Sequence, residues 1–284
     1  MKRIVWLLWA LLLVLPAQGW AAGNMQNESF AKAKRLLEQK VYYDHRQTLY
    51  CGAAFDEHKQ IRLPRGFTAD KYRKRSSRVE WEHVVPAENF GRAFPEWREG
   101  HALCVDRKGK AFKGRACAEK VNADYRRMQA DMYNLYPAIG SVNAVRSNKN
   151  FQMLGPDVPS AFGSCPMKIS GNKVEPPERA RGQIARSSLY MADSYGEHYR
   201  LSRQQQQLMQ AWARQYPVDA WECRRASRSE RLQGNENRFV KDPCLSVGLW
   251  PEQEAVFFWK AMKAFFEEMQ VTGRKKLDEG TYHL

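Results

Sequence analysis

The chain has 284 residues and a formal net charge of +15, from 46 lysines and arginines against 31 aspartates and glutamates. This length suits one large domain or two small ones, and the 43% of hydrophobic residues can form a sizeable core. Beyond the N-terminus no stretch is long and apolar enough to cross a bilayer, which excludes a protein with several membrane spans. The basic charge favours a polyanionic partner, either nucleic acid or a membrane surface.

The N-terminus has the order of a secretory signal peptide. A basic start precedes an almost unbroken apolar run over residues 4–16, and small residues follow at 19–23. The run is shorter than the roughly 20 residues that a membrane span needs, so a cleaved signal is favoured over an anchor. We expect cleavage near Ala21 to Gly23, with residues 1–22 removed. The mature protein is then periplasmic or extracellular, without stable membrane insertion.

All six cysteines follow this segment. An even number of cysteines in an oxidising compartment favours three disulfides, and the absence of a C-x-x-C motif disfavours a zinc site. Six cysteines can pair in fifteen ways, and the sequence alone does not select one of them. Proximity favours two pairs and leaves a third: Cys104–Cys117, Cys223–Cys244 and Cys51–Cys165.

Hydrophobic periodicity outlines the first half of the chain. Residues 29–43 carry apolar side chains at helical spacing, which predicts a helix. Residues 44–75 are polar and irregular. Residues 79–85 are β-branched and aromatic, which predicts a strand. Residues 91–120 are rich in glycine, lysine and arginine, and this composition predicts a long loop closed by a disulfide.

The second half is predicted to be mainly helical. A helix is expected over 122–135, capped by Asn122 and ended by Pro137. Later helices begin at Pro177 and after Ser202.

The predicted domain boundaries follow from the absence of linkers. No repeat or flexible linker interrupts residues 23–244, which predicts a single domain. The extension 245–284 has the pattern of an amphipathic helix. We expect it to pack on the domain or to mediate self-association, and a membrane-surface role is the weaker alternative. The protein as a whole is expected to be a monomer.

One short run carries the groups that phosphodiester hydrolysis needs. Such a reaction needs a base for water, which suits histidine, and positive charge for the phosphate, which suits a metal ion and an arginine. Five of the six histidines lie in polar surroundings, whereas His83 lies between Glu82 and an apolar segment. In a strand these two neighbours point to opposite faces, Glu82 towards a metal and His83 towards a water or phosphate. A surface pair in an ordinary strand is the alternative.

Further candidates lie downstream. Asn134 is placed late in the predicted helix, where its amide oxygen can bind Mg²⁺ or Ca²⁺, although asparagine also commonly ends helices. Arginines can contact phosphates, or can simply be solvated surface charges. The candidates of this kind are Arg115, Arg179, Arg181 and Arg186. The chain has no H-E-x-x-H, G-x-S-x-G or glycine-rich phosphate loop.

Taken in order, these segments resemble the endonuclease I family of bacterial periplasmic and extracellular nucleases. The resemblance extends from about residue 28 to residue 244. The segments that carry it are Ser77 to Pro86 (S-R-V-E-W-E-H-V-V-P), Met128 to Gly140 with Val142-Asn143, Ala180 to Arg186 (A-R-G-Q-I-A-R), and Trp221-Glu222-Cys223.

The resemblance implies an α+β fold, in which a mixed α/β single domain stabilised by disulfides contains a ββα-metal (His-Me finger) nuclease centre. It implies non-specific cleavage of DNA, and usually RNA, with Mg²⁺ as the cofactor and Ca²⁺ or Mn²⁺ able to take the same site. His83 is then the general base, Glu82 and Asn134 are the metal ligands, and Arg115 holds the cleaved phosphate. The cysteine pairing favoured above is consistent with the family.

The nucleic-acid contacts expected on this basis are Arg78, Arg179, Arg181 and Arg186. The alternative is a non-catalytic exported protein that binds nucleic acid through its charge alone. A metal-dependent phosphoesterase for small substrates is disfavoured by the basic surface.

Overall fold

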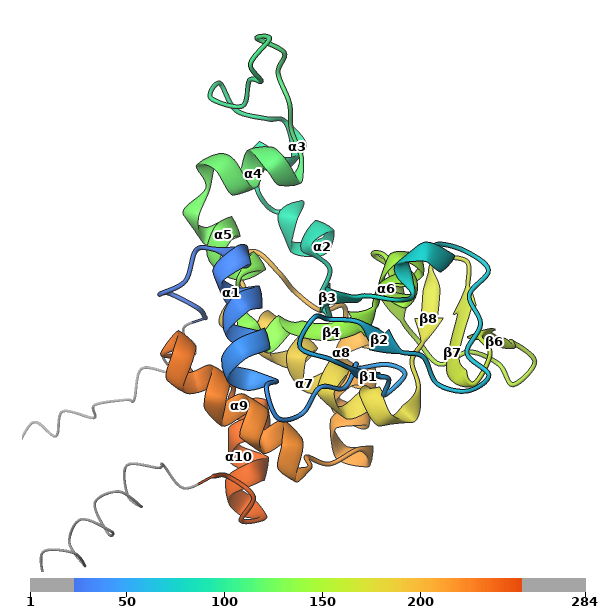
Figure 1. Cartoon of the computed structure of the whole chain (residues 1–284). Helices are drawn as coiled ribbons and strands as arrows, with labels where there is room; N and C mark the ends of the chain where they lie inside the picture. The colour runs from blue at the N-terminus through green and yellow to red at the C-terminus, as the bar shows by residue number, and fades with distance from the viewer. Residues whose placement is uncertain (1–22, 252–284) are drawn as a thin grey trace, which may run out of the picture.

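The computed structural model describes residues 23–251 (Figure 1). The expected signal peptide, residues 1–22, lies outside this part of the chain, as does most of the expected C-terminal amphipathic helix, residues 252–284. Within the described residues no helix has the length and apolar character needed to cross a membrane.

The N-terminal part forms a helix, as the periodicity predicts. Helix α1 (Phe30–Leu36) is capped by the Ser29 side chain and continues directly into the π-helical segment η1 (Leu37–Val41). The polar region that follows contains only short elements, namely β1 (Ala54–Phe55), β2 (Ile61–Arg62) and the 3₁₀ turn η2 (Arg73–Arg75).

The centre of the fold is a pair of antiparallel strands followed by a helix (Figure 1). Strand β3 (Val79–His83) pairs with β4 (Leu135–Ile139), so that Glu82 lies opposite Tyr136 and His83 opposite Leu135. Helix α6 (Gly140–Arg146) begins directly after β4 and packs on β3. A Cβ at Gly140 would lie 2.5 Å from the Arg75 carbonyl oxygen, so the close approach of α6 requires glycine there.

The helix predicted over residues 122–135 is shorter than expected. Helix α5 ends at Gln129, the 3₁₀ turn η3 (Met132–Asn134) follows, and the next residues form β4. The buried Asp131 side chain caps η3 and accepts hydrogen bonds from Tyr190 and Tyr195. These long-range contacts stop the helix, and Pro137 lies within the strand because a two-stranded sheet leaves one edge without a ladder partner.

Short helices connect β3 to β4, and Figure 1 shows the segment between α3 and α4 extending away from the body. The sequence predicts a loop over residues 91–120, and the structure has a short helix near each end of that stretch, α3 and α4. The elements are α2 (Ala87–Gly91), α3 (Pro95–Arg98), α4 (Arg115–Val121) and α5 (Ala123–Gln129).

The C-terminal half adds a four-stranded sheet and four helices to the two-stranded sheets β1-β2 and β3-β4. The sheet has the strand order β5-β8-β7-β6, with β5 parallel to β8 and the other pairs antiparallel. Its strands are β5 (Asn150–Phe151), β6 (Ser160–Phe162), β7 (Cys165–Ser170) and β8 (Lys173–Glu175). The helices are α7 (Glu178–Ser194), α8 (Arg203–Gln215), α9 (Ala220–Gln233) and α10 (Arg238–Ser246). Helix α7 is buried over most of its length and packs on α8 and α10, so it is the central helix of a mixed α/β domain.

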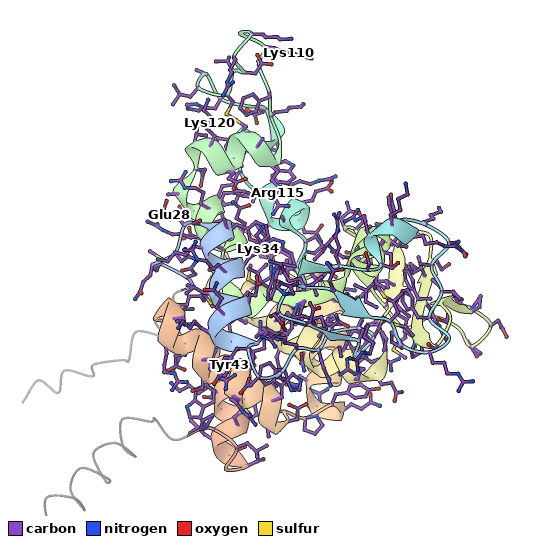
Figure 2. All side chains as sticks on the ribbon, in the orientation of Figure 1. Glu28, Lys34, Tyr43, Lys110, Arg115 and Lys120 are labelled. Atoms are coloured by element: carbon purple, nitrogen blue, oxygen red, sulfur yellow. A yellow bond between two sulfur atoms is a disulfide. The ribbon has the colours of Figure 1, made fainter. Side chains whose placement is uncertain are left out.

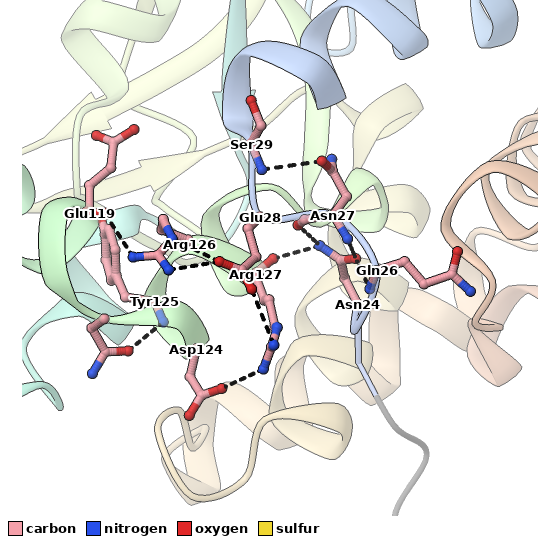
Figure 3. Close-up of polar contacts among 11 residues, drawn as sticks. Asn24, Gln26, Asn27, Glu28, Ser29, Glu119, Asp124, Tyr125, Arg126 and Arg127 are labelled. Atoms are coloured by element: carbon pink, nitrogen blue, oxygen red, sulfur yellow. Dashed lines mark hydrogen bonds and ion pairs between the residues drawn. The ribbon is translucent and has the colours of Figure 1, made fainter.

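A polar network ties the first described residues to the body of the protein (Figure 3). The main-chain nitrogen of Asn24 donates hydrogen bonds to the Tyr195 hydroxyl, at 2.7 Å, and to the Asp131 carboxylate, at 3.4 Å. Glu28 forms ion pairs with Arg126 and Arg127 on α5. The segment before α1 is therefore fixed at both ends, and the position of α1 follows from it.

The structure confirms the cysteine pairing that proximity favours. The disulfides are Cys51–Cys165, Cys104–Cys117 and Cys223–Cys244, with Cα–Cα separations of 5.1, 5.4 and 5.7 Å. The first bridge joins the segment before β1 to the four-stranded sheet, across a sequence separation of 114, whereas the second closes a separation of 13.

Removing the long-range bridge is expected to cost more stability than removing the short one. In the chain-entropy description, Cys51→Ser with Cys165→Ser should lower the free energy of unfolding by about 2 kcal/mol more than Cys104→Ser with Cys117→Ser, because the longer loop restricts the unfolded chain more. Urea unfolding followed by circular dichroism measures both losses. Equal losses, or a larger loss for the short loop, would show that loop closure does not govern these bridges.

Candidate active site

A pocket of about 300 Å³ lies where the end of β3 meets α2, α6 and the start of α4. We call it the site pocket. Three of the predicted residues line it, namely Glu82, His83 and Arg115, although they come from segments more than 30 residues apart. Its remaining lining residues are Trp81, Pro86, Ala87, Glu88, Trp97, Asn143, Ser147 and Asn148.

Glu82 is almost completely buried, and one of its carboxylate oxygens is fully engaged. Oε1 accepts hydrogen bonds from the Tyr50 hydroxyl, at 2.6 Å, and from Arg146 Nη1, at 2.8 Å. Among the described residues, no hydrogen bond is donated to Oε2. Burial raises the pKa of the Glu82 carboxyl group, and the charge of Arg146 opposes this rise. The carboxylate therefore has one oxygen fixed by the protein and one available to a ligand.

His83 has a fixed orientation because one ring nitrogen is bound to the main chain. Nε2 lies 2.9 Å from the carbonyl oxygen of Gln129. A carbonyl can only accept a hydrogen bond, so Nε2 carries the hydrogen and Nδ1 is the unprotonated nitrogen. Burial lowers the pKa of His83 to about 3, and the positive charge of Arg115 acts in the same direction. The ring is therefore neutral near pH 7, with Nδ1 able to take a proton.

An aromatic ring from α1 forms the wall beside His83. The Phe30 ring centroid lies 5.0 Å from that of the imidazole. The Arg115 guanidinium lies 5.3 Å from the same Phe30 ring, and its Nη2 donates a long hydrogen bond of 3.4 Å to Gln129 Oε1. Among the described residues Arg115 forms no ion pair, so its charge is available to an anion in the pocket. Figure 2 shows Arg115 at the base of the projecting segment, above α1.

The structure gives Asn134 contacts that occupy its whole amide group. Oδ1 accepts a hydrogen bond of 2.7 Å from the main-chain nitrogen of Val85, and Nδ2 donates one of 2.9 Å to the Val85 carbonyl oxygen. Asn134 is fully buried and is not among the residues that line the site pocket. In this structure the side chain extends the β3–β4 pairing by one step.

A different asparagine, Asn143, lies in the site pocket. It lines the pocket together with Glu82, and its Nδ2 donates a hydrogen bond of 3.0 Å to Glu80 Oε2. With the nitrogen turned towards Glu80, the amide oxygen accepts no hydrogen bond within the described part of the chain. The sequence interpretation did not select Asn143, although it lies in a segment that carries the family resemblance.

The spacing on two elements explains how Asn143 and Glu82 come together. Glu80 and Glu82 are two residues apart on β3, so they share one face of the strand. Asn143 and Arg146 are three residues apart on α6, so they share one face of the helix. Asn143 binds Glu80, and Arg146 binds Glu82. Arg75 and Arg78 also form ion pairs with Glu80. These pairs fix the Glu80 carboxylate in the position from which it binds Asn143.

The arginines expected to contact nucleic acid have different environments. Arg181 is buried and paired with Glu175 at 2.8 Å, and Arg186 is buried and paired with Glu222. Arg179 is largely engaged by the main-chain oxygens of residues 48 and 49. These three side chains stabilise the fold around α7 and do not line the site pocket. Arg78 is exposed over 60% of its side chain and lies close to Asn143, in a neighbouring hollow.

The donor atoms in the pocket suit a hard divalent cation. No group of three or more histidine, cysteine, aspartate or glutamate side chains gathers as a metal site within residues 23–251. One carboxylate oxygen and one amide oxygen, from Glu82 and Asn143, nevertheless lie in the same pocket and accept no hydrogen bond from any described residue. Mg²⁺ is commonly held by one or two protein oxygens and keeps several waters, so these residues fit such an ion.

The chain belongs to the endonuclease I family, whose profile matches residues 29–244. The resemblance seen in the sequence is thus confirmed. An extracellular deoxyribonuclease of Aeromonas hydrophila is 40% identical over 242 residues, which cover 83% of this chain and 95% of that protein. A periplasmic deoxyribonuclease of the same organism is 39% identical over 241 residues, or 82% and 92% of the two chains. Endonuclease-1 of Buchnera aphidicola is 34% identical over 224 residues, or 76% and 82%.

The buried guanidinium of Arg146 is expected to be essential for stability. It donates hydrogen bonds to Glu82 and to the carbonyl oxygens of His83 and Val84, so Arg146→Met leaves a buried charge and two carbonyls without a partner. The expected loss in the free energy of unfolding is about 3–5 kcal/mol, measured by urea denaturation. The control is Arg92→Met, which breaks an exposed pair with Glu88 and should cost less than about 1 kcal/mol. A loss for Arg146→Met as small as that of the control would contradict this interpretation.

Proposed function

We propose that this protein is an exported, non-specific endonuclease that hydrolyses phosphodiester bonds in DNA, and also in RNA, with one divalent metal ion. The observation that carries the proposal is the site pocket, in which a neutral histidine, a half-engaged carboxylate and an unpaired arginine face one space. The names of the relatives, which are deoxyribonucleases and an endonuclease, support the activity on DNA. RNA as a second substrate follows from the family resemblance.

In this proposal β3, β4 and α6 form the ββα-metal centre expected from the sequence. Glu82 supplies a carboxylate oxygen, and Asn143 takes the place of Asn134 as the amide ligand. The supporting observation is that one oxygen of Glu82 and the amide oxygen of Asn143 accept no hydrogen bond within residues 23–251, whereas the Asn134 amide is fully bound to Val85. A bound Mg²⁺, or Ca²⁺ or Mn²⁺ in its place, would stabilise the negative charge that develops on the phosphate and the leaving oxygen.

The side chains divide the remaining work. His83 donates Nε2–H to the Gln129 carbonyl oxygen, and this bond keeps Nδ1 free to accept a proton from the attacking water. Arg115 binds the phosphate oxygens, since no acidic residue among those described neutralises it. Phe30 packs against the imidazole and limits its rotation. A buried, neutral histidine adds nothing to polyanion binding, so this arrangement favours an enzyme over the non-catalytic binding protein.

The proposed location is the periplasm or the medium. Two relatives are named as extracellular and periplasmic enzymes, and three disulfides suit an oxidising compartment. The protein is proposed to act as a monomer.

Replacing His83 tests the proposed mechanism. His83→Ala should lower the rate of plasmid DNA cleavage about 10²- to 10⁴-fold in Mg²⁺, because the general base is lost. Binding of DNA by the variant should persist, and EDTA should stop cleavage by the wild type. The matched control is His58→Ala, at an exposed histidine outside the pocket, which should cleave at the wild-type rate. Equal cleavage by the wild type and His83→Ala would rule the mechanism out.

Two asparagine variants separate the metal ligand from the structural residue. Asn143→Ala should raise the Mg²⁺ concentration for half-maximal cleavage about tenfold or more, with little change in the free energy of unfolding. Asn134→Ala should mainly destabilise the fold, by about 1–3 kcal/mol, because both polar groups of Val85 lose their partner. Magnesium titrations of cleavage and urea unfolding of both variants give the comparison. A raised Mg²⁺ requirement for Asn134→Ala, together with a destabilised fold for Asn143→Ala, would instead assign the ligand role to Asn134.

A further inference from the structure

A second hollow, of about 780 Å³, opens beside the site pocket between α1 and β3. We call it the α1 groove. It shares the side chains of Trp81 and Asn143 with the site pocket, so the two hollows are adjacent. A polymer that places one phosphate in the site pocket has to leave that pocket along the surface, and the α1 groove provides a path for it.

The charges on the walls of the α1 groove differ in whether they are neutralised. Lys59 pairs with Glu38 at 3.0 Å, and Arg78 pairs with Glu80 at 3.3 Å. Two other cations, Lys34 and Arg35, line the same groove and form no ion pair with any described residue. The α1 side of the groove therefore has an excess of two positive charges.

These two cations continue the positive charge of the site pocket. Lys34 Nζ lies 4.4 Å from the centroid of the Phe30 ring, and the Arg115 guanidinium lies 5.3 Å from the same ring. Arg35 is the next residue along α1 and is exposed. Figure 2 shows Arg115 and Lys34 following one another down the side of the molecule that carries α1. One aromatic ring thus separates the cation of the site pocket from the first cation of the groove.

The wall that bears these cations has a fixed position. The ion pairs of Glu28 with Arg126 and Arg127 and the buried contacts of Asn24 hold the segment before α1 (Figure 3). Phosphate contacts gain from such rigidity because less side-chain and main-chain entropy is lost on binding.

We propose that the α1 groove binds the DNA strand next to the cleaved bond, with Lys34 and Arg35 contacting the phosphates that neighbour the one beside Arg115. This inference rests on the proposed function, since it uses the site pocket as the point of cleavage. Contacts to phosphates carry no sequence information, so the groove adds affinity and register without base preference. It also sets a minimum substrate length, because short substrates do not reach these two cations.

The test is the salt dependence of binding, measured without cleavage in the His83→Ala background. The double variant Lys34→Gln with Arg35→Gln should weaken binding of a fluorescein-labelled single-stranded DNA. The slope of log K against log salt should become shallower by about 1.4, which corresponds to two phosphate contacts on a single strand. Both residues are on the surface, so the free energy of unfolding should change by no more than about 0.5 kcal/mol.

The matched control removes equal charge from the same helical segment. Lys32→Gln with Lys40→Gln alters two exposed lysines of α1 and η1 that do not line the groove, and should leave the slope unchanged. A wild-type slope for the Lys34 and Arg35 variant would overturn the inference. An equal change in slope for the control variant would also overturn it, because the effect would then reflect net charge alone.

Cleavage by proteins with an intact His83 tells the two proposals apart. The groove variant should lose about tenfold or more in kcat/KM on a long strand relative to a dinucleotide, in line with two lost phosphate contacts. Groove-dependent binding by a wild-type protein that cleaves nothing would refute the proposed function and leave the groove standing. Normal cleavage with no effect of the groove variant on length dependence would refute the role of the groove and leave the proposed function standing.

Discussion

The buried ion pair between Arg146 and Glu82 is the interaction on which the candidate site depends. Arg146 binds the Glu82 carboxylate and the two main-chain carbonyls that follow it, so α6 is locked to the end of β3. Without this cation, a buried carboxylate would take up a proton instead of remaining charged. The same contact fixes which carboxylate oxygen faces the site pocket. One guanidinium therefore meets a requirement of stability and, in the proposed function, a requirement of metal binding.

The rest of the site follows from matching two periodicities. A strand repeats its faces every two residues and a helix every three or four, so Glu80 and Glu82 can meet Asn143 and Arg146 in order. Gly140 permits the close approach that this match needs. The contact between Glu80 and Asn143 orients an amide, and the contact between Glu82 and Arg146 orients a carboxylate. His83, the last residue of β3, also lines the pocket and is held independently by the Gln129 carbonyl oxygen. The proposed metal ligand and the proposed base are thus adjacent in sequence but are positioned by separate contacts.

Local signals were sufficient for some features of this protein and not for others. The strand at β3 and the caps of α5 and α8 could be predicted from nearby residues, whereas proximity only favoured the cysteine pairing and could not select it. The contacts of Asn134 with Val85 could not be predicted, because the end of α5 is set by Tyr190 and Tyr195, which reach Asp131 from another part of the chain. Arg181 and Arg186 look like surface charges in the sequence, but distant acids, Glu175 and Glu222, neutralise them in the core. Each discrepancy arises from a partner far away in the sequence.

The anchoring of Asn24 has a consequence for the order in which the chain can assemble. The ribosome synthesises the N-terminal part of the chain first. Tyr195, whose hydroxyl accepts a hydrogen bond from the main-chain nitrogen of Asn24, comes 171 positions later. Until then the segment before α1 is held only by its contacts with Arg126, Arg127 and Asp131. Since α1 also forms a wall of the α1 groove, the surface proposed to bind DNA is completed only when most of the polypeptide has been made. A nascent chain therefore carries Glu82 and His83 well before Tyr195, one of the residues that anchor the segment leading to α1, has been made.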